Sequence, residues 1–464
     1  MTSLTFYGGI NEIGGNKFLL EDRDTKIFLD FGMSFKKFGK FYEEFLQPRT
    51  LNALGDLIDL GILPNVDGIY RDDLLKNEGR KLTKEPVIDG VIFSHAHADH
   101  TWHAALLHKD IPFYCTEESK KYMQAVGETG RSTVFTEVYK YKENFVDRRK
   151  KPEEIRKFNV FEPGKKFKID GIEILPLAID HSIYGAVGMI IYASEGIIVY
   201  TGDIRLHGLN NELTSEFIAK AAEEKPDLLL VEGTRVKEAV HGNSEQQVYE
   251  SVNSHIANTK ELVCCSFPNK DMDRLNTFFN AASKNKRRLA LPAKMMYLLK
   301  LFNGKNVPKA DEFALYMDRR SSGRFEEQDY DAWQRKYLKY KNMVTFEDIR
   351  KNQSKYVFFC DFFNLNELLD VKPNLGSSYI YSLSEPFNEE MQIDRRRMEN
   401  WLNHFKLPMF RAHASGHASG SEIKELIQKV NAKKVIPIHT EHPEVFREFG
   451  EKVKIVGVEE KLSM

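Results

Sequence analysis

The chain has 464 residues, of which 42% are hydrophobic and 29% charged, as is typical of a globular protein with two or three domains. The 67 Lys and Arg residues nearly balance the 68 Asp and Glu residues, which excludes a protein whose overall field attracts polyanions. None of the four cysteines lies in a CxxC motif, so we expect no disulfide framework. No apolar run approaches the roughly 20 residues of a membrane span, and no signal peptide is visible. We therefore expect a cytoplasmic protein without a membrane partner.

Strands and hairpins are predicted for most of the first 210 residues. The hydrophobic pattern indicates strands at 3–9, 17–22 and 25–32, a helix within 51–62, and hairpins with Asp-Gly and Glu-Gly turns at 167–180 and 186–203. Between these elements, VIDGVIFSH is a short apolar strand that ends in a group of histidines. The first 210 residues are therefore expected to be rich in hairpins.

Short apolar strands then alternate with helical stretches. The strands are expected at 227–234, 261–268, 287–292, 355–361 and 377–382, and one of the helices at 271–285. This alternation favours βαβ units and a parallel sheet, and no GxGxxG motif follows these strands to suggest a dinucleotide site. Residues 409–440 are expected to form a strand, a loop, a helix with a capping box at Ser419 and Glu422, and a final strand.

The segment FSHAHADH, at residues 93–100, contains four side chains that can bind metal ions. His95 and His97 lie two apart, so in an extended segment they project to the same side. Asp99 and His100 come where the chain turns into a helix, so they can face a second position close to the first. Neutral imidazole and carboxylate are ligands of zinc and similar divalent ions. The motif supplies two ligands to each of two ions, so a two-metal site needs further ligands and a bridging group.

Three more candidate ligands end apolar strands. His181 ends LPLAIDH, Asp203 ends GIIVYTGD, and His439 ends KKVIPIH. Each run would deliver its last side chain to the edge of a sheet. A lone polar residue at a strand end is usually a turn residue, but here the three join an unusually specific cluster.

These motifs resemble those of the metallo-β-lactamase superfamily: HAHADH, His181 in DHSIYGAVG, Asp203 in TGD, and Asp30 in LDFG. The resemblance implies an α/β fold, an αβ/βα sandwich, with two Zn²⁺ ions on one edge; Mn²⁺ is the alternative metal. It implies that His95, His97 and His181 hold the first ion, that Asp99, His100 and His439 hold the second, and that Asp203 bridges the two. Asp30 would orient one of the ligands.

The long insertion between Asp203 and His439 is similar to that of the β-CASP nuclease branch, in which a second α/β domain covers the metal site. Glu232 in LLLVEGT, His417 in HASGHAS and His439 in PIHT match the additional motifs of this branch. GGINEIGGN and HASGHAS are most similar to ribonuclease J, in a compact form without the bacterial C-terminal domain. The implied domains are a metallo-β-lactamase domain at 1–236 and 411–464 and a β-CASP domain at 237–410.

The resemblance implies a ribonuclease that cleaves single-stranded RNA as a 5′–3′ exonuclease, an endonuclease or both, with water activated between two zinc ions. Besides Asp99, the expected catalytic residues are His417, which would contact or protonate a phosphate oxygen, and Glu232, which would orient His417. His413, Ser415 and Gly416 are expected to bind a neighbouring phosphate. A homodimer is compatible with the sequence, which does not define the oligomeric state.

Three other functions are less consistent with the sequence. A DNA nuclease of the same fold is disfavoured by His439, because DNA-repair members of the branch tend to carry valine there. A small-molecule metallo-hydrolase is disfavoured by the long insertion, which would hinder open access to the metals. A non-catalytic RNA-binding protein is disfavoured because such relatives usually lose ligands, whereas this chain keeps all seven.

Overall fold

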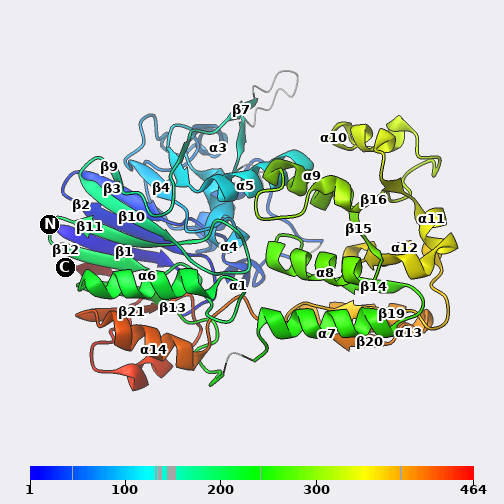
Figure 1. The fold of residues 1–464 in the computed structure, drawn as a ribbon. Helices are drawn as coiled ribbons and strands as arrows, with labels where there is room; N and C mark the ends of the chain where they lie inside the picture. The colour runs from blue at the N-terminus through cyan, green and yellow to red at the C-terminus, as the bar shows by residue number, and fades with distance from the viewer. Residues whose placement is uncertain (44, 131–132, 134–137, 144–152, 241, 387–388) are drawn as a thin grey trace. The chain divides into compact units, whose positions relative to one another are not determined.

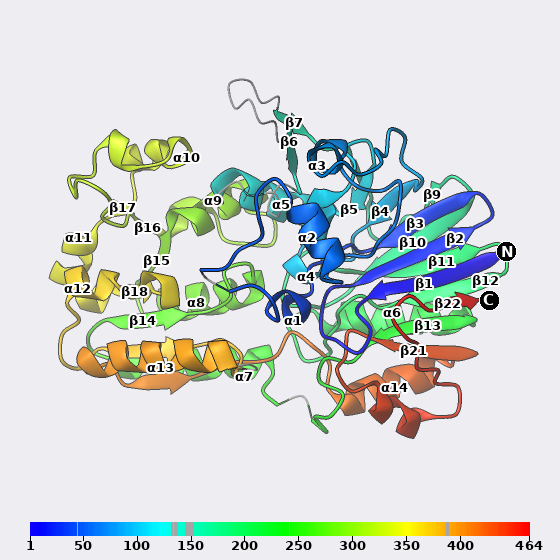
Figure 2. The ribbon, with the colours of Figure 1, turned by 180° about the vertical axis from the view of Figure 1, so that it is seen from behind.

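A computed structural model covers residues 1–464 and describes all of them except 44, 131–132, 134–137, 144–152, 241 and 387–388 (Figures 1 and 2). The chain forms two compact units. The sandwich unit comprises Met1–Leu206, Asn210–His241 and Gly416–Met464, and the inserted unit comprises His207–Leu209 and Gly242–Ser415. Among the described residues, no helix combines the length and apolar character that a membrane crossing requires.

The first sheet of the sandwich unit has the strand order β22-β1-β2-β3-β4-β5-β8. Its strands are β1 (Thr2–Gly8), β2 (Lys17–Asp22), β3 (Thr25–Leu29), β4 (Gly90–Ile92), β5 (Phe113–Cys115), β8 (Phe158–Val160) and β22 (Lys461–Ser463). The pairs from β22 to β3 are antiparallel, whereas β3, β4, β5 and β8 run parallel. The carboxyl ends of β3 and β4 therefore meet at one edge of the sheet.

The second sheet has the strand order β21-β13-β12-β11-β10-β9. It contains β9 (Phe167–Ile169), β10 (Ile172–Ala178), β11 (Val187–Ala193), β12 (Gly196–Tyr200), β13 (Leu228–Glu232) and β21 (Lys434–Ile438). The two predicted hairpins are confirmed as β9–β10 and β11–β12. Strands β12, β13 and β21 are parallel, so β13 pairs within this sheet and not with the later strands among which the alternating pattern had grouped it.

Apolar side chains from the facing sides of the two sheets form the core between them, including Phe6, Phe18, Ile174 and Met189. Burying each such side chain contributes about 1.5–3 kcal/mol. On the other side of the second sheet lie α6 (Asn211–Glu223) and α14 (Gly420–Val430), and the predicted capping box of α14 is confirmed. The layers form an αβ/βα sandwich (Figure 1).

Most other elements of the sandwich unit lie around the first sheet, where Figure 2 shows α2, α3 and α5 beside β4 and β5. They are α1 (Phe35–Phe38), α2 (Ala53–Asp59), α3 (Asp72–Asn77), α4 (Ala98–Thr101), α5 (Glu117–Thr129), the hairpin β6 (Lys140–Lys142) and β7 (Glu153–Ile155), and the 3-10 helix η1 (Trp102–Leu106). The 3-10 helix η7 (Pro443–Phe449) instead packs beside α14 on the second sheet. The helix predicted within 51–62 is confirmed as α2.

The inserted unit is built on a parallel sheet of order β17-β16-β15-β18-β14-β19-β20, as the alternating pattern predicts. Its strands are β14 (Val263–Ser266), β15 (Arg288–Pro292), β16 (Ala314–Tyr316), β17 (Met343–Val344), β18 (Tyr356–Phe359), β19 (Ser378–Tyr381) and β20 (Met409–Arg411). Its helices are α7 (Glu245–Asn258), α8 (Met272–Lys284), α9 (Ala293–Phe302), α10 (Ala332–Arg335), α11 (Phe346–Lys351), α12 (Glu367–Val371) and α13 (Glu389–His404), with 3-10 helices η2 (Ala310–Glu312), η3 (Glu327–Asp329), η4 (Lys336–Lys339), η5 (Gln353–Lys355) and η6 (Phe362–Asn364).

Candidate metal centre

The predicted ligands lie on short loops that follow strands of the two sheets. His95 follows β4, Asp203 follows β12, and His439 follows β21 directly. His97 is the N-cap residue of α4, so Asp99 and the adjacent His100 fall in the first turn of that helix. Because β3 and β4 run parallel in the first sheet, as do β12, β13 and β21 in the second, the carboxyl ends of these strands deliver the side chains to the same edge of the sandwich.

Three imidazoles form a first group. His95 Nε2 lies 3.0 Å from His97 Nδ1, which lies 3.1 Å from His181 Nε2. Nitrogen ligands bind zinc at about 2.0–2.1 Å, so neighbouring ligands around a tetrahedral ion are separated by roughly 3.3 Å. The spacing of the three nitrogen atoms therefore fits one face of a zinc coordination shell.

A second group contains Asp99, His100 and His439. Asp99 Oδ2 lies 3.2 Å from His439 Nε2, and His100 Nε2 lies 3.2 Å from Asp203 Oδ2. That same Asp203 oxygen is 3.7 Å from His95 Nε2, 3.6 Å from His439 Nε2 and 3.9 Å from His181 Nε2. Asp203 Oδ2 thus lies between the two groups, where one carboxylate can contact an ion in each.

Outer hydrogen bonds define which ring nitrogen of His100 and His181 faces the cluster. His100 Nδ1 is 2.7 Å from Asp30 Oδ2, and His181 Nδ1 is 2.6 Å from the carbonyl oxygen of Gly416. Because these oxygens accept, each Nδ1 carries the proton and each Nε2 presents a lone pair to the cluster. His439 Nδ1 similarly contacts the Thr234 hydroxyl at 2.8 Å.

Asp30 is itself held by several donors. The backbone N–H of Ser94 donates to Asp30 Oδ1 and the Ser94 hydroxyl to Oδ2, each at 2.7 Å, and the Tyr200 hydroxyl also donates to Oδ2. Asp30 has the left-handed φ of 57°, and His439 has φ 49°. Sequence reasoning identified Asp30 but missed Tyr200 and Thr234; the one available signal was that each lies within three residues of a predicted site residue.

A glycine-rich loop lies against the Asp99 turn. Gly15 N donates to the Asp99 carbonyl oxygen at 2.9 Å, and a Cβ added to Gly14 would lie 2.6 Å from Asp99 Cβ. At Gly32 an added Cβ would lie 1.6 Å from the Asp99 carbonyl oxygen. The same loop accepts a hydrogen bond from His439 N at the carbonyl oxygen of Gly9, at 2.7 Å. The GGINEIGGN motif therefore supports ligands that lie far apart in the sequence.

The electrostatics favour the metal-binding protonation states at His95, His181 and the two carboxyls, whereas at His100 burial would lower the pKa but Asp203, Asp30 and Asp99 raise it. Burial, assisted by neighbouring imidazoles, holds the pKa of His95 and His181 well below the usual histidine range. Burial would raise the pKa of Asp99 and Asp203, but His100 and His439 outweigh it, so both carboxyls have a lowered pKa. Neutral imidazole and ionised carboxylate are the forms that bind metal ions.

Two buried polar atoms in the cluster make no hydrogen bond: His100 Nε2 and Asp203 Oδ1. Leaving such atoms without a partner costs about 1–3 kcal/mol each, and metal coordination would remove that cost for a ligand atom. The candidate ligand atoms in the described residues form four overlapping groups: His95, His97 and His181; Asp99, His100, Asp203 and His439; His181, Asp203 and His417; and Glu232, His417 and His439. The donor types, spacing and unpaired atoms together fit two divalent ions.

Glu232 and His417 form a pair beside this cluster. His417 Nδ1 is 3.1 Å from Glu232 Oε1 and 4.0 Å from Asp203 Oδ2. Glu232 is fully buried and accepts backbone hydrogen bonds from Ile204 and Thr234, at 3.1 and 3.0 Å. Burial would lower the pKa of His417, but the Glu232 carboxylate and, more weakly, Asp203 and Asp99 raise it to about 9.

The residues expected to bind a phosphate have different environments. Gly416 packs against His181 and Ser182, where its carbonyl group holds the His181 ring. His413 and Ser415 belong to the inserted unit. There, His413 Nδ1 lies 3.2 Å from an Arg274 guanidinium nitrogen, and the Ser415 carbonyl oxygen lies 2.9 Å from His207 Nε2.

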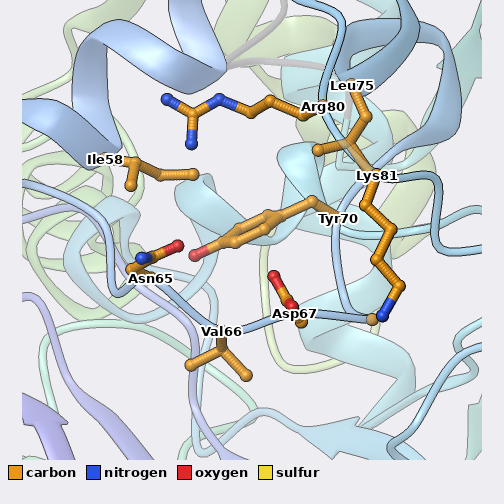
Figure 3. Close-up of a pocket in the computed structure, with 9 residues that line it drawn as sticks. Ile58, Asn65, Val66, Asp67, Tyr70, Leu75, Arg80 and Lys81 are labelled. Carbon is orange, nitrogen blue, oxygen red and sulfur yellow. The ribbon is translucent and has the colours of Figure 1, made fainter.

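A separate pocket of about 200 Å³ lies beside α2 and α3 (Figure 3). Its lining consists of Ile58, Asn65, Val66, Asp67, Gly68, Tyr70, Leu75, Arg80 and Lys81. Arg80 forms ion pairs with Asp59 and Glu78, so its charge is already compensated. The pocket is lined by none of the predicted site residues.

Comparisons with protein families agree with this geometry. A family model described as a beta-lactamase superfamily domain matches residues 69–258, which contain six of the seven candidate ligands. A second model, described as a Zn-dependent metallo-hydrolase RNA specificity domain, matches residues 410–459, which contain His417 and His439. The chain therefore contains a domain similar to the beta-lactamase superfamily model, followed by one similar to the Zn-dependent metallo-hydrolase RNA specificity model.

Among curated proteins, the chain is similar to those named ribonuclease J. It is 23% identical over 462 residues to the protein of Mycoplasma pneumoniae, covering 95% of this chain and 68% of that protein. It is 22% identical over 476 residues to that of Helicobacter pylori strain J99, covering 96% of this chain and 56% of the relative. The chain thus spans only about half to two thirds of the length of these relatives.

A solved structure shows the same fold over nearly the whole chain. The crystal structure of a protein of unknown function from Enterococcus faecalis V583 matches with a TM-score of 0.77 and 22% identity, covering 99% of both chains. The predicted fold class, an α/β metallo-β-lactamase sandwich with an inserted α/β unit, is confirmed.

Proposed function

We propose that this protein is a metal-dependent ribonuclease that hydrolyses phosphodiester bonds in single-stranded RNA. The observation that carries the proposal is the convergence of seven ligand-type side chains, with Asp203 Oδ2 between two groups, beside the Glu232–His417 pair. The RNA specificity model that matches residues 410–459 and the ribonuclease J names of the relatives support RNA as the substrate.

We assign two divalent ions to the cluster, with Zn²⁺ favoured by the three-imidazole group and Mn²⁺ as the alternative. His95, His97 and His181 would hold one ion, Asp99, His100 and His439 the other, and Asp203 would contact both. When bound, such ions lower the pKa of water and stabilise the charge on a phosphate. The outer contacts of Asp30, Gly416 and Thr234 would keep the ligand rings oriented.

His417 is suited to proton transfer. Its side chain is 22% exposed, whereas Glu232 is fully buried, so His417 is the member of the pair that can meet a substrate. With Nδ1 held by Glu232, Nε2 is the atom that would contact a non-bridging oxygen or donate a proton to the leaving oxygen. The raised pKa of His417 keeps the donor form populated at neutral pH. Glu232 acts as a positioning residue.

We interpret residues 237–410 as a β-CASP domain between the two parts of a metallo-β-lactamase domain, 1–236 and 411–464. His413 and Ser415 remain candidates for contacts with a substrate phosphate. Gly416 has a different role in this proposal, because its carbonyl oxygen accepts from the metal-ligand candidate His181. The proposal includes no partner chain, and a homodimer stays a prediction.

The decisive experiment is digestion of RNAs labelled at one end and carrying a 5′-phosphate, a 5′-triphosphate or a 5′-hydroxyl, with zinc or manganese added. Release of mononucleotides from the 5′ end would identify a 5′–3′ exonuclease, and discrete internal fragments an endonuclease. Absence of cleavage of all three RNAs by folded, metal-loaded protein would overturn the proposal. Parallel digestion of single-stranded DNA separates a ribonuclease from a DNA nuclease, and turnover of a thioester or lactam alone would favour a small-molecule hydrolase.

A further inference from the structure

Two lysines and four aromatic residues form a compact cluster on the inserted unit, which we call the lysine–aromatic surface. It consists of Tyr297 and Lys300 on α9, Trp333 on α10, Lys336 and Tyr337 on η4, and Tyr340 directly after η4. Figure 1 shows α9 and α10 on the same side of this unit. The cluster contains none of the candidate metal ligands.

Rings and ammonium groups alternate within the cluster. Lys300 Nζ lies 4.5 Å from the ring centre of Tyr337 and 4.2 Å from that of Tyr340. Lys336 Nζ lies 4.9 Å from the ring centre of Tyr297. Trp333 meets both Tyr297 and Tyr337 edge-to-face, with ring centres 5.9 and 6.3 Å apart.

The side chains of this surface differ in their solvent exposure. Tyr337 is fully buried and forms the floor of the cluster. Tyr297, Trp333 and Tyr340 are half-buried, and both lysines are exposed. The surface therefore offers partly accessible aromatic rings next to positive charges, which is the combination that single-stranded nucleic acids recognise by base stacking and phosphate contacts.

The charges of this surface are not compensated. Within the described residues, neither Lys300 nor Lys336 forms an ion pair, although Lys339, in the same helix as Lys336, is paired with Glu327. Residues 332–341 contain four basic residues and no acidic one. Burial and, secondarily, the charge of Lys336 lower the pKa of Lys300. The two ammonium groups thus repel each other, which a purely structural role does not explain.

We propose that the lysine–aromatic surface is a second RNA-binding site, at which Lys300 and Lys336 contact backbone phosphates while bases stack on Trp333 and Tyr340. The proposal rests on the proposed function for the identity of the polyanion. Single-stranded RNA fits better than a duplex, because the bases of a duplex are stacked on each other and do not present their faces to aromatic side chains. Because the net charge of the chain is near neutral, attraction of RNA phosphates away from the metal centre depends on local positive charge such as that of these lysines.

The test measures RNA affinity and metal-centre chemistry separately. Binding of a fluorescent 20-nucleotide single-stranded RNA with phosphorothioate linkages is followed by anisotropy, using the full-length zinc-loaded protein. Removing one phosphate contact reduces the slope of log affinity against log salt by about 0.7, and losing a stacked base weakens binding about fivefold or more. We expect the reduced salt slope in Lys336→Gln and Lys300→Gln, and the weaker binding in Tyr340→Ala.

Lys339→Gln is the matched control, because it removes the same charge from the same helix at a lysine that Glu327 already neutralises. It is expected to change the salt slope much less than Lys336→Gln. The double variant Lys300→Gln and Lys336→Gln should melt no lower than the parent protein, since the repulsion between the two lysines is removed. A clear loss of thermal stability would instead favour a structural role for the lysines and contradict the proposal.

Turnover of bis(p-nitrophenyl) phosphate reports on the metal centre without RNA contacts and should be unchanged in these variants. Equal RNA affinity of Lys336→Gln, Lys339→Gln and the parent protein would overturn the second site while leaving the proposed ribonuclease intact. RNA binding that depends on Lys336 in a protein unable to cleave RNA would support the second site and overturn the proposed function. A parent protein that does not bind RNA would overturn the second site.

Discussion

The metal cluster and the lysine–aromatic surface hold charge in opposite ways. In the cluster, every carboxylate has several partners, and Asp30 alone accepts from His100, Ser94 and Tyr200. On the surface, two lysines lie over aromatic rings, and neither forms an ion pair with another described residue. The first arrangement is buried and organised before any ligand arrives, whereas the second leaves its charges for a partner to neutralise.

Because of this difference, substitutions in the two regions should affect the protein to different extents. A buried network loses more than one contact when a member is altered, because the remaining groups are left without partners in a low dielectric. An exposed cation contributes through solvent-screened attraction, so its effect is smaller and depends on salt. The four predictions that follow probe this contrast, beginning with the largest expected effect.

Asp203→Asn should abolish RNA cleavage and reduce metal content, because Asp203 Oδ2 lies between both ligand groups. Metal content by mass spectrometry and cleavage of labelled RNA measure the two effects. Asp227→Asn is the control, since its carboxylate pairs with Lys433 on an outer turn. A folded Asp203→Asn protein with a full metal complement and normal cleavage would contradict the assignment of the cluster.

Glu232→Gln should keep the metal but lower the cleavage rate by about 10²–10⁴-fold, the usual contribution of general acid–base catalysis. Glu232 is the main group that raises the pKa of His417, against burial, which lowers it. In the metal-free protein we therefore expect the pKa of His417, near 9 in the parent, to fall on this substitution.

Histidine NMR titration measures this shift, and Glu238→Gln is the control because Glu238 pairs with Arg235 and not with His417. The direction of the His417 pKa shift also determines how the stability of the folded protein depends on pH. A raised pKa stabilises the folded state below the unfolded value of about 6.5 and the contribution is lost as the pH rises through 9. An unchanged His417 titration in Glu232→Gln would show that the pair does not interact as proposed.

Asp30→Asn should weaken metal binding by about 10–100-fold while the protein stays folded, as expected for a group that orients a ligand ring. Asp30 holds His100 at 2.7 Å, and His100 contributes to the second ligand group. Competition with a chelating dye gives the affinity. Asp22→Asn is a matched buried control, because Asp22 accepts from Thr2 and Ser194 instead. Equal metal affinity of both variants would argue against an orienting role for Asp30.

Salt should have the smallest effect of the four changes, and it should weaken RNA binding without affecting metal binding. Raising sodium chloride from about 0.05 to 0.5 M shortens the screening length and weakens RNA binding, but it should leave the metal content unchanged because the ligands are buried. Equilibrium dialysis and anisotropy on the same samples compare the two regions directly. Loss of metal at high salt would indicate a cluster that is more open than its burial implies.

Much of the candidate site could be predicted because its residues follow local rules. The HAHADH motif is contiguous, and His181, Asp203 and His439 each end an apolar strand. The hairpins, α2 and the capping box of α14 were also predictable from turn chemistry and periodicity. These features depend on residues that are close in the sequence, where propensity is informative.

The supporting contacts could not be predicted because they join distant segments. The contact of Thr234 with His439 depends on the pairing of β13 with β21 in the second sheet, and the approach of Gly14 to Asp99 brings the loop after β1 beside the turn after β4 in the first sheet. The sheet partners of β13 cannot be predicted from its apolar pattern, which fits any buried parallel strand; pairing with β12 and β21 places it in the sandwich, within the range 1–236 that the family resemblance implies. The lysine–aromatic surface likewise requires α9 to meet α10.

The contact between the glycine-rich loop and His439 also has a consequence for biosynthesis. The candidate ligands extend from His95 to His439, and the loop at Gly9 and Gly15 contacts both the Asp99 and His439 turns. A nascent chain therefore lacks a complete cation-binding cluster until His439 has emerged from the ribosome and β21 has docked beside β13. The ribonuclease proposed above would therefore have no complete metal site during its own translation.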